Sequence, residues 1–191
     1  MSGRESGPFM VVSGGQTGVD RAALDAALEL NIPIGGWCPR GRRSEDGMIP
    51  GTYPLKETHA RSYAIRTDWN ARDSDATLII VLNEISSGTR LTISAAQAYA
   101  RPVQIVHLDP DPSPGLLTDE NPRSEQLASV VEWIHLHRIR ILNVAGPRGS
   151  SDDRVYPEAF RFMVDLLKKL IAKPKRPRKV SKSVAKKKSD H

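Results

Sequence analysis

The fold of this chain is decided by the stretch Val-Val-Ser-Gly-Gly-Gln-Thr-Gly-Val-Asp-Arg at residues 11–21. An apolar run ends there in a glycine-rich turn, and the helical pattern Ala-Ala-Leu-Asp-Ala-Ala-Leu follows at residues 22–28. A strand, a glycine turn and a helix start form a place for a phosphate-like anion, because glycine lets the backbone approach a ligand and N–H groups of the helix start point toward it. The spacing Gly-Gly-x-x-Gly is neither the dinucleotide fingerprint nor the Walker P-loop. The stretch therefore predicts an α/β fold that binds a phosphorylated small molecule in neither of the two commonest ways.

Length and composition indicate one globular domain. The 191 residues are enough to bury a core, and the 39% hydrophobic and 26% charged fractions are near ordinary globular values. No apolar run approaches the roughly 18 residues that a membrane helix needs. The single cysteine, Cys38, excludes an internal disulfide and fits a reducing compartment. We therefore expect a cytoplasmic, ligand-binding domain over residues 9–172, with a flexible N-terminus at residues 1–8 and no membrane partner.

The net charge of +6 belongs to the last part of the chain. Residues 173–191 hold nine Lys or Arg and one Asp, which leaves a charge of −2 on the remaining 172 residues. Lys, Arg, Pro and Ser without core-forming side chains predict a disordered basic tail. Such a tail binds nucleic acid non-specifically at low salt, and a purely solubilising role is the simpler interpretation.

Apolar runs and helical patterns alternate along the chain. We expect strands at residues 9–13, 34–38, 76–82, 102–108 and 141–145, helices at 18–30, 63–72, 89–100, 124–137 and 156–172, and loops at 39–55, 109–122 and 146–154, with Ser124 as an N-cap. Continuously apolar strands that alternate with helices predict a Rossmann-like, doubly wound three-layer α/β sandwich with a mainly parallel sheet of about five or more strands. In the strand order 2-1-3-4-5, the turns after the first and third strands would meet in one crevice.

The glycine turn is the first candidate site, and its residues are Ser13, Gly14, Gly15, Gln16, Thr17 and Gly18. Three glycines and two hydroxyls are more than a plain turn needs, although a tight turn whose glycines only satisfy geometry is the alternative. Asp20 would favour the positive end of its helix, hold Arg21 or bind a ligand hydroxyl. Arg21 would reach a phosphate or lie on the surface. We expect Gly15→Val to lower ligand affinity without unfolding the domain, because the side chain would fill the room that phosphate needs.

Two further turns of small residues end strands. Ser86, Ser87, Gly88 and Thr89 follow the strongest strand and either cap the next helix or form a second clamp for an anion or carbonyl. Gly146 and Arg148 follow the last strand, where Arg148 would pair with a phosphate or lie in a plain turn. A helix start contributes only about 0.3–1 kcal/mol, or about 2 when partly buried. Micromolar binding needs roughly 8 kcal/mol, so an organic body must also be buried.

Aromatic side chains are candidates for the walls around that body, namely Trp37, Tyr53 and Trp69. Trp37 lies at the carboxyl end of the second predicted strand, where a flat ring could stack, and ordinary core packing is the alternative. Arg66, Asn70 and Asp73 fall on one face of a helix, which would read a heterocycle edge or form a solvated face with ion pairs. No spacing of metal ligands appears in the sequence.

Several segments, taken in order, resemble those of the molybdenum carrier family: Ser-Gly-Gly-Gln-Thr-Gly-Val-Asp-Arg-Ala-Ala-Leu-Asp-Ala-Ala (13–27), Gly-Gly-Trp-Cys-Pro (35–39), Glu-Asp-Gly (45–47), Tyr-Pro-Leu-Lys-Glu-Thr (53–58), Arg-Thr-Asp-Trp-Asn-Ala-Arg-Asp-Ser-Asp (66–75) and Leu-Asn-Val-Ala-Gly-Pro-Arg (142–148). The resemblance covers about residues 9–172 and places the chain near Rossmann-like nucleotide-binding proteins such as the lonely-guy and lysine-decarboxylase-like enzymes. It implies a small cytoplasmic protein that stores or hands over the molybdenum cofactor, a phosphorylated pterin whose dithiolene carries molybdenum. It also implies homo-oligomers, with a tetramer as the expected form, and a molybdoenzyme or cofactor-synthesis partner.

The chain departs from the family pattern at two places. Ser87-Gly88-Thr89 stands where we expect Gly-Gly-Thr, and the acidic run at residues 152–156 stands where we expect Pro-Gly-Ile-Tyr. The enzymes near this family need a Glu three residues after the Gly-Thr of the second turn, where this chain has Thr92. The resemblance therefore implies a non-catalytic binder, with nucleotides as surrogate ligands. The alternatives are a hydrolase or transferase acting on nucleoside phosphates and a nucleotide-sensing module.

Overall fold

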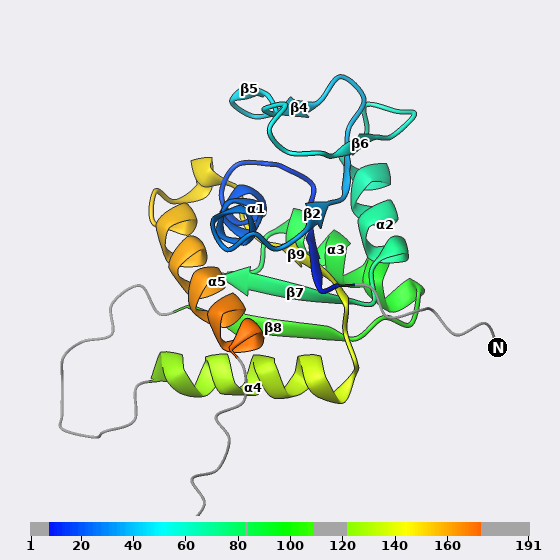
Figure 1. The fold of residues 1–191 in the computed structure, drawn as a ribbon. Helices are drawn as coiled ribbons and strands as arrows, with labels where there is room; N and C mark the ends of the chain where they lie inside the picture. Colours follow the sequence, from blue (N-terminus) through cyan, green and yellow to red (C-terminus); the bar gives the residue numbers. More distant parts are fainter. Residues whose placement is uncertain (1–7, 83, 109–121, 173–191) are drawn as a thin grey trace, which may run out of the picture.

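A five-stranded parallel sheet forms the centre of the computed structural model, which describes residues 8–82, 84–108 and 122–172 (Figure 1). Its strands are β1 (Met10–Val12), β2 (Ile34–Gly35), β7 (Ala76–Val81), β8 (Val103–His107) and β9 (Ile141–Ala145). All six residues of β7 are buried, as expected for an inner strand with helices on both faces.

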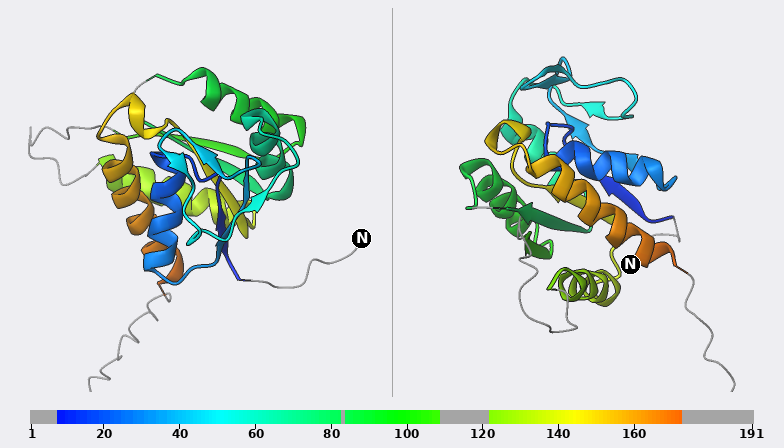
Figure 2. Two further views of the ribbon diagram at one scale, coloured as in Figure 1. Left: turned by 90° about the horizontal axis from the view of Figure 1, so that it is seen from above. Right: turned by 90° about the vertical axis from the view of Figure 1, so that its left-hand side faces the viewer.

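Helices cover both faces of this sheet (Figures 1 and 2). One face carries α1 (Val19–Glu29), α4 (Pro122–Leu136) and α5 (Val155–Ile171), and the other carries α2 (Tyr63–Asp73) and α3 (Ser87–Ala98). Alternate residues of β7 divide between the two layers: Leu78 and Ile80 join the large core under α1, α4 and α5, while Ile79 and Val81 pack toward α3. The predicted Rossmann-like, three-layer α/β sandwich is thus confirmed.

The predicted strand order 2-1-3-4-5 is wrong. The observed order is β2-β1-β9-β7-β8, because the last strand of the chain inserts between the first and the third predicted strands. The sequence hides this insertion, since any buried apolar strand can pair with any other and only contacts between distant residues choose the partners. One such contact is the Ser13 hydroxyl, which donates to the Val144 carbonyl at 2.8 Å and joins β1 to β9.

The observed strand order matches a common one when the strands are numbered from a different starting strand. Numbered from β9, the same sheet reads 3-2-1-4-5, which matches the first five strands of the common doubly wound order 3-2-1-4-5-6. The strand order therefore reverses between β9 and β7, and the helices that follow these two strands, α5 and α3, lie on opposite faces of the sheet. Ligands of such sheets bind in the crevice at this reversal.

The second predicted strand, residues 34–38, is also corrected. It breaks at Gly36 (φ 122°), where a Cβ would lie 2.3 Å from the Ser13 carbonyl oxygen. Beyond the break, β3 (Trp37–Cys38) pairs with β6 (Lys56–Glu57) in a separate two-stranded sheet. The predicted loop over residues 39–55 contains a hairpin of β4 (Arg43–Ser44) and β5 (Gly47–Met48).

The remaining predictions concern the helices and the ends of the chain. Ser124 lies inside α4, so it is not an N-cap. The loop predicted at residues 146–154 contains the short 3-10 helix η1 (Gly149–Ser151). Residues 1–7, most of the loop predicted at 109–122 and the basic tail at 173–191 lie outside the described residues. Among the residues that are described, no helix is long and apolar enough to cross a membrane.

Candidate functional site

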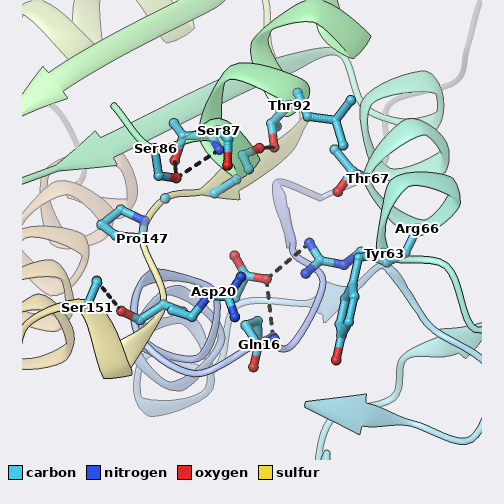
Figure 3. Close-up of a pocket in the computed structure, with 16 residues that line it drawn as sticks. Gln16, Asp20, Tyr63, Arg66, Thr67, Ser86, Ser87, Thr92, Pro147 and Ser151 are labelled. Atoms are coloured by element: carbon cyan, nitrogen blue, oxygen red, sulfur yellow. Dashed lines mark hydrogen bonds and ion pairs between the residues drawn. The ribbon is translucent and has the colours of Figure 1, made fainter. Parts of the chain in front are cut away.

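A pocket of about 260 Å³ opens at the carboxyl ends of the central strands (Figure 3). Its walls come from the turn after β1, the first half of α2, the start of α3 and the turn after β9. This is the reversal point between β9 and β7, where the permuted strand order places a ligand crevice. The turns that follow β1 and β7 do share one pocket, but the turn after β9 lies between them.

Half of the predicted site residues line this pocket, namely Gln16, Asp20, Ser86, Ser87, Gly88, Thr89, Gly146 and Arg148. The other half do not line it, namely Ser13, Gly14, Gly15, Thr17, Gly18, Arg21, Trp37 and Asn70. All three predicted turns contribute residues to this pocket, and the structure divides their residues into those that line it and those that do not.

The glycines of the first turn pack against protein. A Cβ on Gly14 would lie 2.2 Å from the Arg66 guanidinium, and one on Gly18 would lie 2.5 Å from the Pro147 carbonyl oxygen. Gly15 (φ 74°) is similar, because its Cβ would lie 2.6 Å from Leu55. The space that we expected beside Gly15 for a phosphate is therefore filled by the protein itself.

Asp20 and Arg66 form a buried ion pair on one side of the pocket (Figure 3). Arg66 Nη1 lies 3.3 Å from Asp20 Oδ2, and the two side chains are 11% and 5% exposed. The backbone N–H of Gln16 also donates to Asp20 Oδ2, at 3.2 Å. Burial raises the pKa of the Asp20 carboxyl above its ordinary value, and Arg66 lowers that pKa without cancelling the effect of burial. Asp20 therefore holds Arg66, not Arg21, within this turn.

Arg21 turns away from the pocket and binds the β4–β5 hairpin. Its Nη1 lies 2.5 Å from Asp46 Oδ2, and its Nη2 donates to the Ser44 hydroxyl at 2.9 Å. The hydrogen bond from Arg21, followed by one from Ser44, lowers the pKa of Asp46 to about 2. The sequence left open whether Arg21 reaches a phosphate or lies on the surface; in the structure its side chain is 14% exposed and is paired with the hairpin.

Glu45, next to Asp46 in the same hairpin, is outside the pocket lining and contacts residues that line the pocket. Its carboxylate accepts hydrogen bonds from the Thr17 hydroxyl and from the Ser150 N–H and hydroxyl, the last two at 3.0 and 2.6 Å. Its backbone N–H donates to Gln16 Oε1 at 2.9 Å, and Arg148 Nη1 lies 3.8 Å from the carboxylate. Burial acts to raise the pKa of Glu45, but the bonds from Ser150 and Thr17 outweigh burial and lower it. Glu45 thus contacts two pocket residues, Gln16 through its backbone N–H and Arg148 through a longer ion pair.

The start of α3 presents the open part of the pocket. Ser86 Oγ accepts from the Thr89 N–H at 3.1 Å and so caps the helix. The N–H groups of a first helical turn have no partner inside the helix. A Cβ on Gly88 would meet only Ser86 Oγ, at 3.9 Å, so open space lies over this glycine, in contrast to Gly14, Gly15 and Gly18.

Trp37 and Asn70 lie outside the pocket and bind each other. The Asn70 amide accepts from the Trp37 N–H at 2.8 Å and donates to its carbonyl at 2.9 Å. The indole of Trp37 donates to Asp73 at 2.8 Å and meets the ring of Trp69 edge-on, with 4.7 Å between centroids. Asn70 and Asp73 therefore join α2 to β3, while Arg66 on the same helix faces the pocket.

Sequence analysis did not select several pocket residues. Tyr63 and Leu91, which are 40% and 44% exposed, and the buried hydroxyls of Thr67 and Thr92 all line it. Tyr63, Arg66 and Thr67 follow the three-to-four spacing of one helix face, and this spacing could have identified them together from the sequence. Within the described ranges, no group of three or more His, Cys, Asp or Glu could hold a metal ion. A lining with hydroxyls, a helix start and Arg66 suits an anionic organic molecule.

Comparisons with known proteins agree with this architecture. The model of the family described as "Circularly permutated YpsA SLOG family" matches residues 11–167. A crystal structure from Syntrophus aciditrophicus SB, named "Putative molybdenum carrier protein", is 38% identical, covers 86% of this chain and 96% of its own, and superposes with a TM-score of 0.73. A comparison with curated proteins finds no match.

Proposed function

Since the chain belongs to the circularly permutated YpsA SLOG family and is molybdenum carrier-like, we propose that its pocket binds the molybdenum cofactor, and that the protein stores it or hands it over. The observation that carries this proposal is the open space over Gly88, at the start of α3 and at the reversal point of the sheet. The terminal phosphate of the cofactor would lie there, where the positive end of a helix dipole favours an anion.

The exposed apolar side chains that line the pocket suit the flat ring of the pterin. Tyr63 on α2 and Leu91 on α3 line the same pocket from two helices and leave apolar surface uncovered. A flat heterocycle placed between them would bury that surface and add the free energy that a helix start cannot supply. The metal would arrive bound to the sulfurs of the ligand, so the proposal requires no metal ligands from the protein.

The lining also supports binding over catalysis. Asp20 is the only carboxylate among the lining residues that the structure describes, and it is held by Arg66 and by the Gln16 N–H. Thr92 stands where the enzymes related to the molybdenum carrier family have Glu. Its hydroxyl donates to the Gly88 carbonyl at 3.3 Å. A hydroxyl in that position does not supply a general acid or base near neutral pH.

The proposal is tested by analysing the material that co-purifies with the protein. Oxidation of that material should yield a fluorescent pterin derivative in near-stoichiometric amount from the wild type. Gly88→Asp places a carboxylate where we place the phosphate and should lower the yield at least about tenfold through like-charge repulsion. A carboxylate is favourable at a helix start, so the fold should remain intact. The matched neutral variant, Gly88→Asn, should retain most of the pterin. Release of free base from nucleoside monophosphates would overturn the proposal in favour of the enzyme alternative.

A further inference from the structure

We propose that Arg66 is the side chain that binds the oxyanion of the ligand, a phosphate monoester, and that Asp20 and Gly14 position it for this contact. The inference rests on the proposed function, since it assigns the anion-binding residue of the same pocket. The sequence analysis placed Arg66 on a helix face that would read a heterocycle edge, not among the anion-binding turns, and three independent features of its surroundings point to this new role.

The first feature is a hydrogen-bonding donor without a partner. Arg66 Nε is buried and has no hydrogen-bond partner among the described residues, although its side chain lines the pocket. Buried donors of charged groups are satisfied in nearly all proteins, because an unmade bond of this kind is unfavourable. The acceptor that Nε lacks would be supplied by a ligand that enters the pocket.

The second feature is the orientation imposed by Asp20. The contact between Arg66 Nη1 and Asp20 Oδ2, at 3.3 Å, holds one edge of the guanidinium. The planar fork of arginine has a second edge that includes Nε, and two parallel N–H groups match the oxygens of a phosphate. Asp20 therefore fixes the guanidinium through Nη1, and the edge that includes Nε is the one without a partner among the described residues.

The third feature is the close packing of the Arg66 guanidinium against Gly14. A Cβ at Gly14 would lie 2.2 Å from both Cζ and Nη1 of Arg66 and 2.4 Å from Nε. On another side, the ring centroid of Tyr63 lies 6.0 Å from Cζ. The guanidinium thus lies flat over the backbone of the first turn, and Gly14 is required there because any side chain would displace it.

The class of ligand follows from the opposite wall. The same pocket is lined by the hydroxyl residues Ser86, Ser87 and Thr89 at the start of α3. Figure 3 shows Arg66 on α2 and Ser86 and Ser87 near the start of α3 on different sides of the pocket. A tetrahedral oxyanion has several oxygens and can accept hydrogen bonds from donors on two sides. A planar carboxylate has fewer oxygens for such a double contact, so a phosphate monoester fits these walls better.

The test compares three probes by calorimetry with the full chain: inorganic phosphate, 6-hydroxymethylpterin and its phosphate ester. Arg66→Gln should weaken binding of phosphate and of the ester at least about tenfold and leave binding of the pterin alcohol within about twofold, because only the charged hydrogen bonds are lost. Arg72→Gln, the same change six residues further along α2, is the matched control and should bind all three probes as the wild type does.

Gly14→Ala keeps both members of the ion pair. Its methyl group would push the flexible end of Arg66 aside, so it should weaken binding of phosphate and of the ester about threefold or more while the pterin alcohol binds normally. This variant keeps the inference testable if Arg66→Gln leaves Asp20 unpaired and unfolds. Normal phosphate binding by Gly14→Ala and Arg66→Gln, or an equal loss of ester and alcohol, would overturn the inference.

The probes also separate this inference from the proposed function. A wild-type protein that binds phosphate in an Arg66-dependent manner but neither pterin would support the inference and overturn the proposed ligand. A protein that binds the pterin alcohol but not phosphate would overturn the role of Arg66 alone. A protein that binds none of the three would overturn both.

Discussion

The side-chain amide of Asn143 donates a hydrogen bond to the hydroxyl of Thr77 at 3.1 Å, across the register pair that joins β9 to β7. Both residues are buried, with exposures of 2% and 0%. This contact lies where the last strand of the chain enters the sheet, between two strands that are otherwise apolar. It is a polar link that favours this pairing over others, since a slipped register would leave the amide buried without its partner.

Thr77→Val should lower the free energy of unfolding by about 1–3 kcal/mol, because it leaves the buried Asn143 amide short of an acceptor. Urea denaturation measures this change. Thr77→Ser keeps the hydroxyl and should lose less stability than Thr77→Val. A Thr77→Val protein as stable as the wild type would contradict a stabilising role of this hydrogen bond.

Gly15→Val should destabilise the fold, contrary to the expectation from sequence. Gly15 has a φ of 74°, and its Cβ would lie 2.6 Å from Leu55. Left-handed strain and overpacking together should lower the free energy of unfolding by roughly 2–5 kcal/mol. Gly51→Val is the matched control, because a Cβ there has nothing within 4 Å. A folded Gly15→Val protein of wild-type stability that binds ligand weakly would restore the original interpretation.

Asp25 accepts hydrogen bonds from the phenols of Tyr53 and Tyr156, both at 2.7 Å. Burial and then the bond to Asp25 raise the pKa of Tyr156 from 10.0 to about 12, and the same causes raise the pKa of Tyr53. Because these pKa values are higher in the folded state, the stabilisation is complete below pH 10 and is lost as the pH rises through about 12.

Asp25→Asn should therefore shift phenolate formation toward lower pH. Ultraviolet absorbance titration of the folded protein measures this shift, and Tyr156→Phe assigns the contribution of Tyr156. An unchanged titration curve in Asp25→Asn would mean that burial alone sets the pKa values of both phenols.

The ion pair between Arg21 and Asp46 should make the hairpin sensitive to acid. The bonds from Arg21 and Ser44 lower the pKa of Asp46 from 3.8 to about 2, so its stabilisation is present above pH 3.8 and is lost as the pH falls through about 2. Asp46 is 46% exposed, so solvent screening limits the effect to less than about 1 kcal/mol.

Asp46→Asn should accordingly lower the free energy of unfolding at pH 6 and make little difference near pH 2. Glu29→Gln, at an exposed position of α1, removes the same charge away from the hairpin and is the control. Denaturation curves at the two pH values decide the matter. A difference between wild type and Asp46→Asn that stays constant with pH would contradict an electrostatic origin.

Local pattern predicted the elements well. The strand at residues 141–145 has the predicted bounds, and the strand at 76–82 and the helix at 63–72 each differ by one residue from β7 and α2. These elements are specified by residues close together in sequence, through continuous apolar runs and helical spacing. The strand at 34–38 was wrong in part because it breaks at Gly36, which lies close to Ser13, the residue that follows β1.

The candidate site divides in the same way. By itself, the sequence determined that three turns of small residues end strands, and that these turns bring Gln16, Asp20, Ser87 and Arg148 to one edge of the sheet. Only the tertiary structure decided that β9 lies between β1 and β7, that Arg66 reaches Asp20 over Gly14, and which glycine of the pocket turns adjoins open space. The physical reason is that residues distant in sequence determine whether the space beside a glycine is filled or open. Leu55 fills that room at Gly15, and nothing comparable fills it at Gly88.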